Sequence, residues 1–301
     1  MDIRRDDQNS KRGYLTGDFE FFHLKDKKSL HFESHYHDFN KITIFISGAV
    51  TYYVEGRAYQ PKPWDILLKS SREEHTLEVE GGETYERIVI WVNPSFLEKH
   101  SSSECSLTAC FELASGKNRN LLRLSSDKLK NIRQVLLQLE EAKKGGEFGS
   151  RVLGNSLFIQ LIVYLNRLYL GYNEGFRLDD GEYDENIDGI LKYINGNIKG
   201  DLSIDRLSSE FYMSKYYLMH RFKKQTGYSI HSYILQKRLI MASELLKKGM
   251  PATEASIECG FGDYSSFVRA FKKNFGLSPK NYLKSLRQAQ AEYALGKHFI
   301  D

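Results

Sequence analysis

The chain has 301 residues, of which 41% are hydrophobic, so it is long enough and apolar enough for two globular domains with separate cores. No apolar run is long enough to cross a bilayer, and residues 1–12 lack the apolar stretch of a secretory signal, so we expect a soluble cytoplasmic protein without a membrane partner. The three cysteines, Cys105, Cys110 and Cys259, lack zinc-site spacing, which predicts free thiols in a reducing compartment.

The small net charge of +4 hides an uneven distribution. Residues 199–287 carry 16 lysines and arginines against 7 aspartates and glutamates, whereas the rest of the chain carries 27 against 32. A basic third attached to an acidic remainder predicts a polyanionic partner for that third alone. The alternative is that these lysine-rich helix faces are simply solvated, and charge alone leaves it open.

The N-terminal part predicts a small β-domain. We expect residues 1–16 to form a flexible leader and residues 17–98 to form short strands separated by Gly or Pro turns. The expected strands are residues 41–46, 49–54, 66–68, 75–79 and 87–92. Several short strands at this spacing are typical of a small barrel or sandwich.

Two helical patterns follow, in a segment that spans residues 99–171. Residues 127–144 mix leucines and isoleucines with charges, and residues 151–170 are more apolar. The second pattern is too widely apolar for an isolated surface helix, so we expect it to pack on the first helix, on the β-domain or on a partner subunit. Residues 172–186 are acidic and contain Gly, which is typical of an interdomain linker.

Residues 187–292 predict a helical domain with an internal repeat. The expected helices are residues 187–195, 201–208, 214–226, 230–248, 251–259, 263–275 and 281–293. The segment from Phe222 to Gly227, which starts Phe-Lys-Lys, recurs 49 residues later as Phe271 to Gly276, and the helix cap Ser214 recurs as Asp263. Two copies of a capped helix with a basic face and a Gly stop predict a doubled helix-turn-helix.

These repeated residues resemble the DNA-binding domain of the AraC/XylS family of transcription regulators, over about a third of the chain. The family's most recognisable stretch has a Gly-Phe turn, an aromatic, an Arg, Phe-Lys-Lys, Gly, Ser-Pro and an aromatic. In this chain the stretch is Gly260-Phe261, Phe267, Arg269, Phe271-Lys272-Lys273, Gly276, Ser278-Pro279 and Tyr282. The resemblance implies two helix-turn-helix units, joined by a long helix, that bind promoter DNA.

A weaker resemblance, to the cupin-type sensor barrel of the same family, covers the N-terminal part. Its landmarks are a His-Xaa-His, a Gly turn, a Pro-containing turn and a lone His, here His35-Tyr36-His37, Gly48, Pro63-Trp64-Asp65 and His75. Trp64 departs from the family pattern, in which a Gly is usual. The resemblance therefore implies an α+β chain, with an N-terminal cupin-like β-barrel and dimerisation helices, and a C-terminal all-α domain with two helix-turn-helix units.

The exposed faces of the two repeated helices are the candidate DNA contacts, because a helix can enter the major groove and meet the base edges. Arg269 is the strongest candidate for base recognition, since its guanidinium fork fits guanine, and a phosphate contact is the alternative. The aromatic side chains of the repeat are expected in the core. The expected DNA-binding residues are Ser214, Lys215, Tyr216, Met219, His220, Lys223, Asp263, Tyr264, Ser265, Arg269, Lys272 and Lys273.

The candidate effector residues in the barrel are His35, His37, Lys41, Thr43, His75 and Trp91. The three histidines also suit a metal site. Metal-binding cupins usually place a Glu four residues after the second His, where this chain has Lys41, and a cation there would repel a metal. We therefore expect a pocket for a small polar metabolite such as a sugar, or for an anion with Lys41 as counter-charge. Ordinary hydrogen-bonded packing of the histidines is the alternative.

Together, the residues and the resemblance predict a transcription activator without enzymatic activity or cofactor. It is expected to act as a homodimer, with promoter DNA, a small metabolite and RNA polymerase as partners. No nucleophile with a positioned base and no usefully spaced pair of carboxylates stands out. Three alternatives stay open: a ligand-independent regulator with a vestigial barrel, a repressor, and a metal-dependent cupin enzyme fused to a DNA-binding domain.

Overall fold

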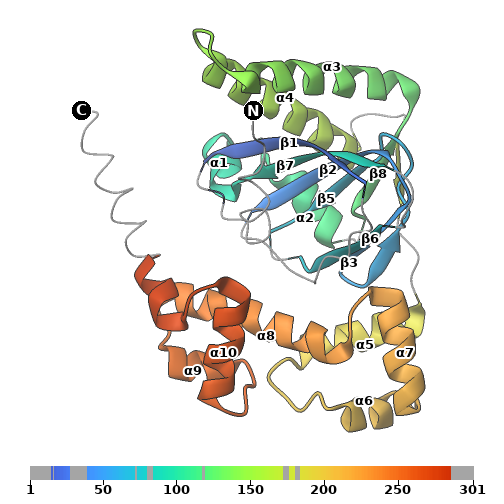
Figure 1. Ribbon diagram of the computed structural model, residues 1–301, viewed down its shortest axis with the longest axis vertical. Coiled ribbons are helices and arrows are strands. Elements are labelled where there is room, and N and C mark those ends of the chain that lie inside the picture. Colours follow the sequence, from blue (N-terminus) through green and yellow to red (C-terminus); the bar gives the residue numbers. More distant parts are fainter. Residues whose placement is uncertain are drawn as a thin grey trace. The chain divides into compact units, whose positions relative to one another are not determined.

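The computed structural model describes residues 15, 17–27, 39–71, 73–79, 84–116, 119–171, 176–179 and 184–285 (Figure 1). The chain divides into two compact units between residues 183 and 184. The N-terminal unit contains the described strands and helices α1 to α4, and the C-terminal unit contains helices α5 to α10. Apart from Leu15, the expected leader lies outside the described residues. No helix in the described parts of the chain is long and apolar enough to cross a membrane.

The larger sheet of the N-terminal unit has six strands, in the order β1-β7-β2-β5-β8-β9. All of its pairings are antiparallel. The strands are β1 Phe19–Asp26, β2 Asn40–Ser47, β5 Ile66–Lys69, β7 Tyr85–Val92, β8 Leu121–Leu124 and β9 Phe176–Asp179. Three of these, β2, β5 and β7, are the isoleucine- and valine-rich segments that the sequence predicts as strands.

The smaller sheet has three strands, in the order β4-β3-β6. They are β3 Val50–Val54, β4 Arg57–Tyr59 and β6 His75–Val79. The chain passes from β2 into this sheet at Gly48, whose φ is +112°. A Cβ at Gly48 would lie 2.9 Å from the Cα of Tyr85, so only glycine fits the close approach of this turn to β7.

The β-barrel that the resemblance implies is not closed among the described residues, because no strand pairing joins the two sheets there. The sheets instead face each other as a sandwich, and one apolar cluster contains Phe45 and Leu67 from the larger sheet and Tyr52 and Val54 from the smaller. The strands of the smaller sheet are only three to five residues long and offer few ladder hydrogen bonds. Because no described strand pairing joins the two sheets, the packing of large side chains between them holds them together.

The opposite face of the larger sheet packs on helices. They are α1 Pro94–Lys99, α2 Ala109–Gly116, α3 Ser126–Lys144 and α4 Ser150–Tyr169. Ile42 and Ile44 of β2 share one core cluster with Phe158 and Leu161 of α4. Packing within the chain thus accounts for most of the apolar face of α4, which was one of the expected alternatives.

The sheet extends beyond the expected range of residues 17–98. Strand β8 lies within residues 99–171, expected to be helical, and β9 lies within residues 172–186, expected to be a linker. Each of these strands has four residues, which is too short for an alternation of apolar and polar side chains to be recognised. The sequence also does not predict the helices α1 and α2, because six and eight residues are too few to show a clear helical period.

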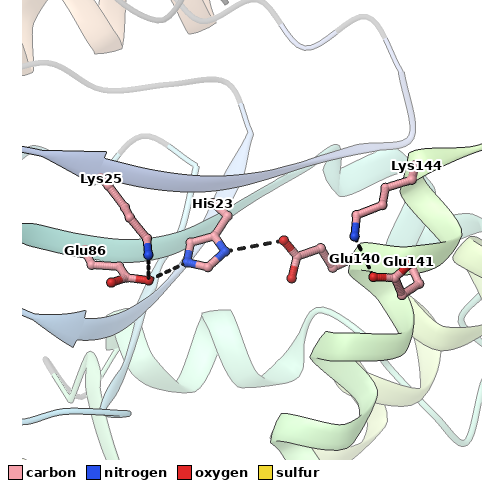
Figure 2. Close-up of polar contacts among 6 residues, drawn as sticks. All are labelled: His23, Lys25, Glu86, Glu140, Glu141 and Lys144. Atoms are coloured by element: carbon pink, nitrogen blue, oxygen red, sulfur yellow. Dashed lines mark hydrogen bonds and ion pairs between the residues drawn. The ribbon is translucent and has the colours of Figure 1, made fainter.

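Polar contacts join the edge strand β1 to β7 and α3 (Figure 2). His23 Nε2 lies 2.8 Å from Oε1 of Glu86, and His23 Nδ1 lies 3.3 Å from Oε1 of Glu140. Lys25 forms an ion pair with the same Glu86 oxygen at 3.0 Å, and its hydrogen bond holds the pKa of Glu86 below the usual value. Because side chains alternate along β7, the next residue, Arg87, lies on the other face and is buried.

The C-terminal unit contains the helices that the repeat predicts. They are α5 Glu185–Gly196, α6 Ile204–Glu210, α7 Lys215–Thr226, α8 Ile230–Lys247, α9 Ala252–Glu258 and α10 Tyr264–Phe275, followed by helical residues 279–285. One core cluster contains Leu218 and Phe222, and a second contains Phe267, Phe271 and Tyr282. The long helix α8 contributes to both clusters. The structure therefore has two helix-turn-helix units, α6–α7 and α9–α10, connected by α8.

The segment after α5 contacts both α8 and the turn of the second helix-turn-helix unit. Arg238 of α8 donates from Nε to the carbonyl oxygen of Ile198 at 3.0 Å and from Nη2 to that of Gly200 at 2.8 Å. Gly260, in the turn after α9, has a φ of +74°. A Cβ at Gly260 would lie 2.8 Å from the carbonyl oxygen of Lys199, so a larger residue does not fit there.

Candidate nucleic-acid interface and ligand site

The candidate reading helices, α7 and α10, begin in the same way. The hydroxyl of Ser214 accepts a hydrogen bond from the Tyr217 amide at 3.3 Å, and a carboxylate oxygen of Asp263 accepts one from the Ser266 amide at 2.7 Å. This bond holds the pKa of Asp263 below its usual value. Both side chains thus satisfy free amides of a first helical turn, as the sequence predicts.

The two helices also end in the same way. Gly227 and Gly276 both have a φ of +76°, and each amide donates to a lysine carbonyl oxygen, of Lys223 or Lys272, at 2.9 Å. A left-handed glycine is the usual end of such a helix. The basic residues of the last turn are therefore at matching places in the two helices.

The turns before the two helices differ by one residue. The Met213 amide donates to the carbonyl oxygen of Ser208 at 3.0 Å, and the Phe261 amide donates to that of Ser256 at the same distance. These residues are 48 apart, whereas the caps and everything after them are 49 apart. The second turn therefore contains an additional residue, Gly262, directly before the cap.

All twelve residues expected to contact DNA are exposed. Tyr216 is 77% exposed and Met219 is 46% exposed on α7, and Tyr264 is 43% exposed on α10. The aromatic residues expected in the core are buried or, for Phe261, partly buried against the second core. The sequence pattern therefore separates the inward from the outward face of each helix correctly.

Several exposed side chains have neighbours that hold them in place. Arg269 Nη2 donates to the hydroxyl of Ser266 at 3.1 Å, one turn earlier on α10. The equivalent residue of α7 is His220, whose ring stacks on that of Tyr216 with centroids 6.1 Å apart. The long guanidinium of α10 thus has a shorter aromatic counterpart on α7.

The second candidate site lies on the inner face of the larger sheet. Lys41, Thr43 and Phe45 alternate along β2 with the core residues Ile42 and Ile44, so they face the smaller sheet. Trp91 of β7 lies directly opposite Lys41, and the Lys41 ammonium is 5.9 Å from the centroid of its ring. Three of the expected effector residues are therefore brought together.

Of the three candidate histidines, His75 alone lies within the described residues. His75 is buried on β6 opposite Val54, and its Nδ1 donates to the carbonyl oxygen of Glu73 at 3.0 Å. His35 and His37 lie outside the described residues. No group of three potential metal ligands occurs within the parts of the chain that are described. A metal site that includes His35 and His37 thus stays a hypothesis.

Two buried cations on the inner face were missed by the sequence analysis, Lys69 and Arg87. Lys69 ends β5 directly opposite Lys41 of β2. Burial lowers the pKa of Lys41 to about 8 and that of Lys69 well below its usual value, and Arg87 contributes to both shifts. The signal in the sequence was a lysine at the end of an apolar strand, but its partner depends on strand register, which the sequence does not give.

A buried carboxyl group accompanies these cations. Glu73 accepts hydrogen bonds from the Ser70 amide at 2.5 Å and from the Asn120 side chain at 3.2 Å. Burial, and then the nearby charge of Glu55, raise the pKa of Glu73 to about 7. Its hydrogen bonds connect the end of β5 with the segment before β8.

Two family models match the chain in the order of its two units. The model described as an AraC-like ligand binding domain matches residues 19–162, and the one described as a helix-turn-helix domain matches residues 207–285. The described β8 and α3 thus belong to the matched N-terminal region, together with both sheets except β9.

Individual relatives and solved structures match either most of this chain or about a third of it. The HTH-type transcriptional activator RhaS of Enterobacter sp. (strain 638) is 24% identical over 267 residues, which cover 83% of this chain and 86% of the relative. Among solved structures, ToxT from Vibrio cholerae covers 89% of this chain and 98% of its own length at 16% identity and a TM-score of 0.34. The DNA-binding domain of AdpA in complex with a target DNA covers 35% of this chain and 96% of its own at 21% identity and a TM-score of 0.34.

The matches of the two family models coincide with the sandwich unit and the doubled helix-turn-helix unit that the structure shows. The chain therefore belongs to the AraC family of DNA-binding transcription regulators, with an N-terminal ligand-binding domain and a C-terminal helix-turn-helix domain.

Proposed function

We propose that this chain is an effector-controlled transcription activator that places α7 and α10 in successive major-groove segments of promoter DNA. The observation that carries the proposal is the duplication itself. Each helix has a side-chain cap at its start, and a left-handed glycine and a pair of exposed lysines at its C-terminal end, on a unit with excess positive charge. The relative RhaS is named a transcriptional activator, which favours activation over repression.

The exposed residues divide into two groups by their chemistry. Arg269, Ser265 and Tyr264 on α10, and His220, Met219 and Tyr216 on α7, lie toward the start or middle of each helix and are proposed to meet base edges. Lys223 and Lys272, with Lys215 and Lys273, are proposed to bind phosphates, which adds affinity and salt dependence but no sequence information. Ser214 and Asp263 serve as caps, so a DNA contact would use the hydroxyl proton of Ser214 or the second carboxylate oxygen of Asp263.

The test is a DNA selection with the full-length protein, followed by binding measurements on the selected site and its single-base variants. Arg269→Ala should cost about 1–3 kcal/mol on the selected site and lose discrimination at one base position. Arg167→Ala is the matched control, because Arg167 is exposed and lies in the other unit. Equal weakening on every sequence would instead make Arg269 a phosphate contact.

We further propose that the active form is a homodimer. Large apolar side chains are exposed on the α3–α4 hairpin, at Leu137, Phe148, Val152 and Leu153. A second copy of the chain would cover them, and two copies would present four reading helices to a promoter with RNA polymerase. Sedimentation of Leu153→Glu should show monomers if the hairpin is the interface. A dimer unchanged in both Leu153→Glu and Leu137→Glu would place the interface elsewhere.

Effector control requires a small molecule that binds one DNA-binding arrangement better than the other. The effector site is proposed to be the inner face of the larger sheet, where Lys41, Thr43 and Trp91 lie together. A small polar metabolite such as a sugar fits the polar groups and the aromatic ring. If no metabolite changed promoter affinity, the hypothesis of a ligand-independent regulator with a vestigial barrel would replace this part of the proposal.

A further inference from the structure

Two lysines on the inner face of the larger sheet stand directly opposite each other. The register of β2 and β5 pairs Lys41 with Lys69 across the strands. Side chains of such a pair have Cβ atoms about 4.5–5.5 Å apart, and like charges in this position are destabilising. Lys69 is only 2% exposed, so water does little to screen the repulsion.

Among the described residues, no acidic side chain lies at hydrogen-bonding distance from either lysine. The Lys69 ammonium lies 5.0 Å from the ring centroid of Tyr52, and that of Lys41 lies near the ring of Trp91. Neither makes an ion pair or a hydrogen bond with any residue that the structure describes. The nearby Glu73 attracts Lys69 from a greater distance, but its own hydrogen bonds go to Ser70 and Asn120.

The third cation of this face, Arg87, strengthens the imbalance. Its guanidinium pairs with Asp26 and stacks on the ring of Tyr85, 4.1 Å from the centroid. Even so paired, Arg87 lowers the pKa of both lysines, which means that its positive charge is felt at both. Among the described residues, three cations on this face are set against two carboxyl groups, Asp26, which pairs with Arg87, and Glu73, which is hydrogen-bonded elsewhere. Such an excess of positive charge favours an anion.

A buried hydroxyl lies beside the lysines and has no hydrogen-bond partner among the described residues. Thr43 is two residues from Lys41 on β2, so both side chains are on the same face. Its Oγ1 is buried and makes no hydrogen bond in the described parts of the structure, and the residue is 2% exposed. A hydroxyl can donate to an anionic oxygen, and leaving it unpaired in a protein interior costs free energy.

We propose that the effector of this chain carries a carboxylate or phosphate group, which Lys41, Lys69 and Thr43 bind on the inner face of the sheet. The proposal rests on the proposed effector control and narrows the ligand from any polar metabolite to an anionic one. The rings of Trp91 and Tyr52, which flank the two ammonium groups, would contact the uncharged part of the ligand. A neutral sugar would leave both lysines without a counter-charge.

Trp91 provides the readout, because the chain has only two tryptophans. In full-length Trp64→Phe protein, Trp91 is the single tryptophan, and its fluorescence is titrated at constant ionic strength. The probes are inorganic phosphate, glucose 6-phosphate, gluconate and uncharged glucose. We expect a saturable change with at least one anion and none with glucose. Comparison of gluconate with the two phosphates tells whether the site takes a carboxylate or a phosphate.

Variants of the lysines separate binding from folding. Lys69→Met and Lys41→Met should each weaken the anion response by about tenfold or more, since a charge-assisted hydrogen bond is lost. Lys130→Met, at an exposed site on α3, should leave it unchanged. Without anion, the first two variants should unfold at the same or a higher temperature than the parent, because a buried like-charge pair is removed. A lower unfolding temperature would mean that the lysines serve the fold.

Three results would overturn the anion site: no saturable response to any of the anions, a response to glucose that exceeds them, or an unchanged response in Lys69→Met. The same samples are then tested for promoter affinity with and without probe. Anion binding that leaves promoter affinity unchanged would contradict effector control but keep the site. A glucose response that changes promoter affinity would keep effector control and contradict the anionic ligand.

Discussion

The two helix-turn-helix units have the same framework and different surfaces. In both, a side-chain cap starts the second helix, two buried residues four apart anchor it, and a glycine with the same φ ends it. The turns differ by the additional Gly262, and the outward residues differ except for the two lysines of the last turn. His220 on α7 stands where α10 has Arg269.

This difference separates two tasks of a reading helix. The shared caps and buried residues hold the helix on its unit, and the divergent outward residues are proposed to decide which bases it contacts. Substitutions of shared residues should therefore have equal effects in the two units, and substitutions of divergent residues should have unequal ones. The following changes test that rule, beginning with the largest expected effect.

The largest effect is expected from the shared core. Phe222 and Phe271 are both fully buried, at equivalent positions of α7 and α10. Truncation of either to Ala should destabilise the helical unit by about 3–5 kcal/mol, through lost burial and the cavity left behind. Urea unfolding followed by circular dichroism measures both. Tyr212→Ala is the control, because Tyr212 is 97% exposed. A loss in only one of the two would contradict equivalent anchoring.

The turns should respond unequally. Gly260→Ala places a Cβ 2.8 Å from a backbone oxygen at a φ of +74°, and a left-handed conformation alone costs a non-glycine residue about 1–2 kcal/mol. The contact lies where Lys199 meets the second unit, so we expect lower stability and weaker binding to a full promoter site. Tyr212 occupies the matching place in the first turn, also with a positive φ of +50°, and tolerates a large side chain. If Gly260→Ala bound the promoter normally, the contact between Lys199 and the turn at Gly260 would not set the spacing between α7 and α10.

Local patterns gave most of the helical unit from the sequence. Caps such as Ser214 and Asp263, glycine stops and phenylalanines at helical spacing act within one or two turns, so the sequence displays them directly. The repeat does not reveal the additional residue Gly262, because the 49-residue offset holds only from the caps onward. The six-stranded sheet was harder, since β9 joins it from a segment that is distant in the chain.

The proposed ligand site shows the same limit of sequence-based prediction. Lys41 was predicted, because it stands at a position that the family resemblance marks. Lys69 was missed, because only the pairing of β2 with β5 brings it opposite Lys41. Trp64 replaces a usual Gly and nevertheless has a φ of +72°. The Arg133 guanidinium lies 4.1 Å from its ring centroid, a contact that helps to offset the backbone strain.

The exposed faces of α7 and α10 should be distinguishable by a substitution that gives α7 a new base preference. His220→Arg gives α7 the guanidinium that α10 has at the equivalent position. We expect a new preference for guanine at one base pair of the first half of the site, worth about 1–3 kcal/mol. Binding to a set of single-base variants measures it, with the second half of the site as the internal control. A uniform gain in affinity on all sequences would show that this position faces a phosphate.

The shared lysines should contribute equally to salt dependence. Lys223→Ala and Lys272→Ala should each reduce the slope of log affinity against log salt by about one, and the double variant by about two. Base preference should not change in any of them. The exposed Lys62, in the other unit, supplies the control Lys62→Ala. A change of base preference in one single variant would show that its lysine contacts a base edge.

The smallest effect is expected at the exposed turn of the first unit. Tyr212→Gly relieves a left-handed conformation worth about 1–2 kcal/mol but makes the unfolded chain more flexible by about 0.5–1 kcal/mol. The net result should be a stabilisation of a few tenths of a kcal/mol to about 1 kcal/mol, measurable as a small rise in the urea midpoint. Tyr212→Ala keeps the strain and loses the same ring, so it separates the two causes. If both variants weakened promoter binding equally, the exposed ring of Tyr212 would contact DNA. The turn would then belong to the proposed DNA interface, of which Ser214 is the first expected residue.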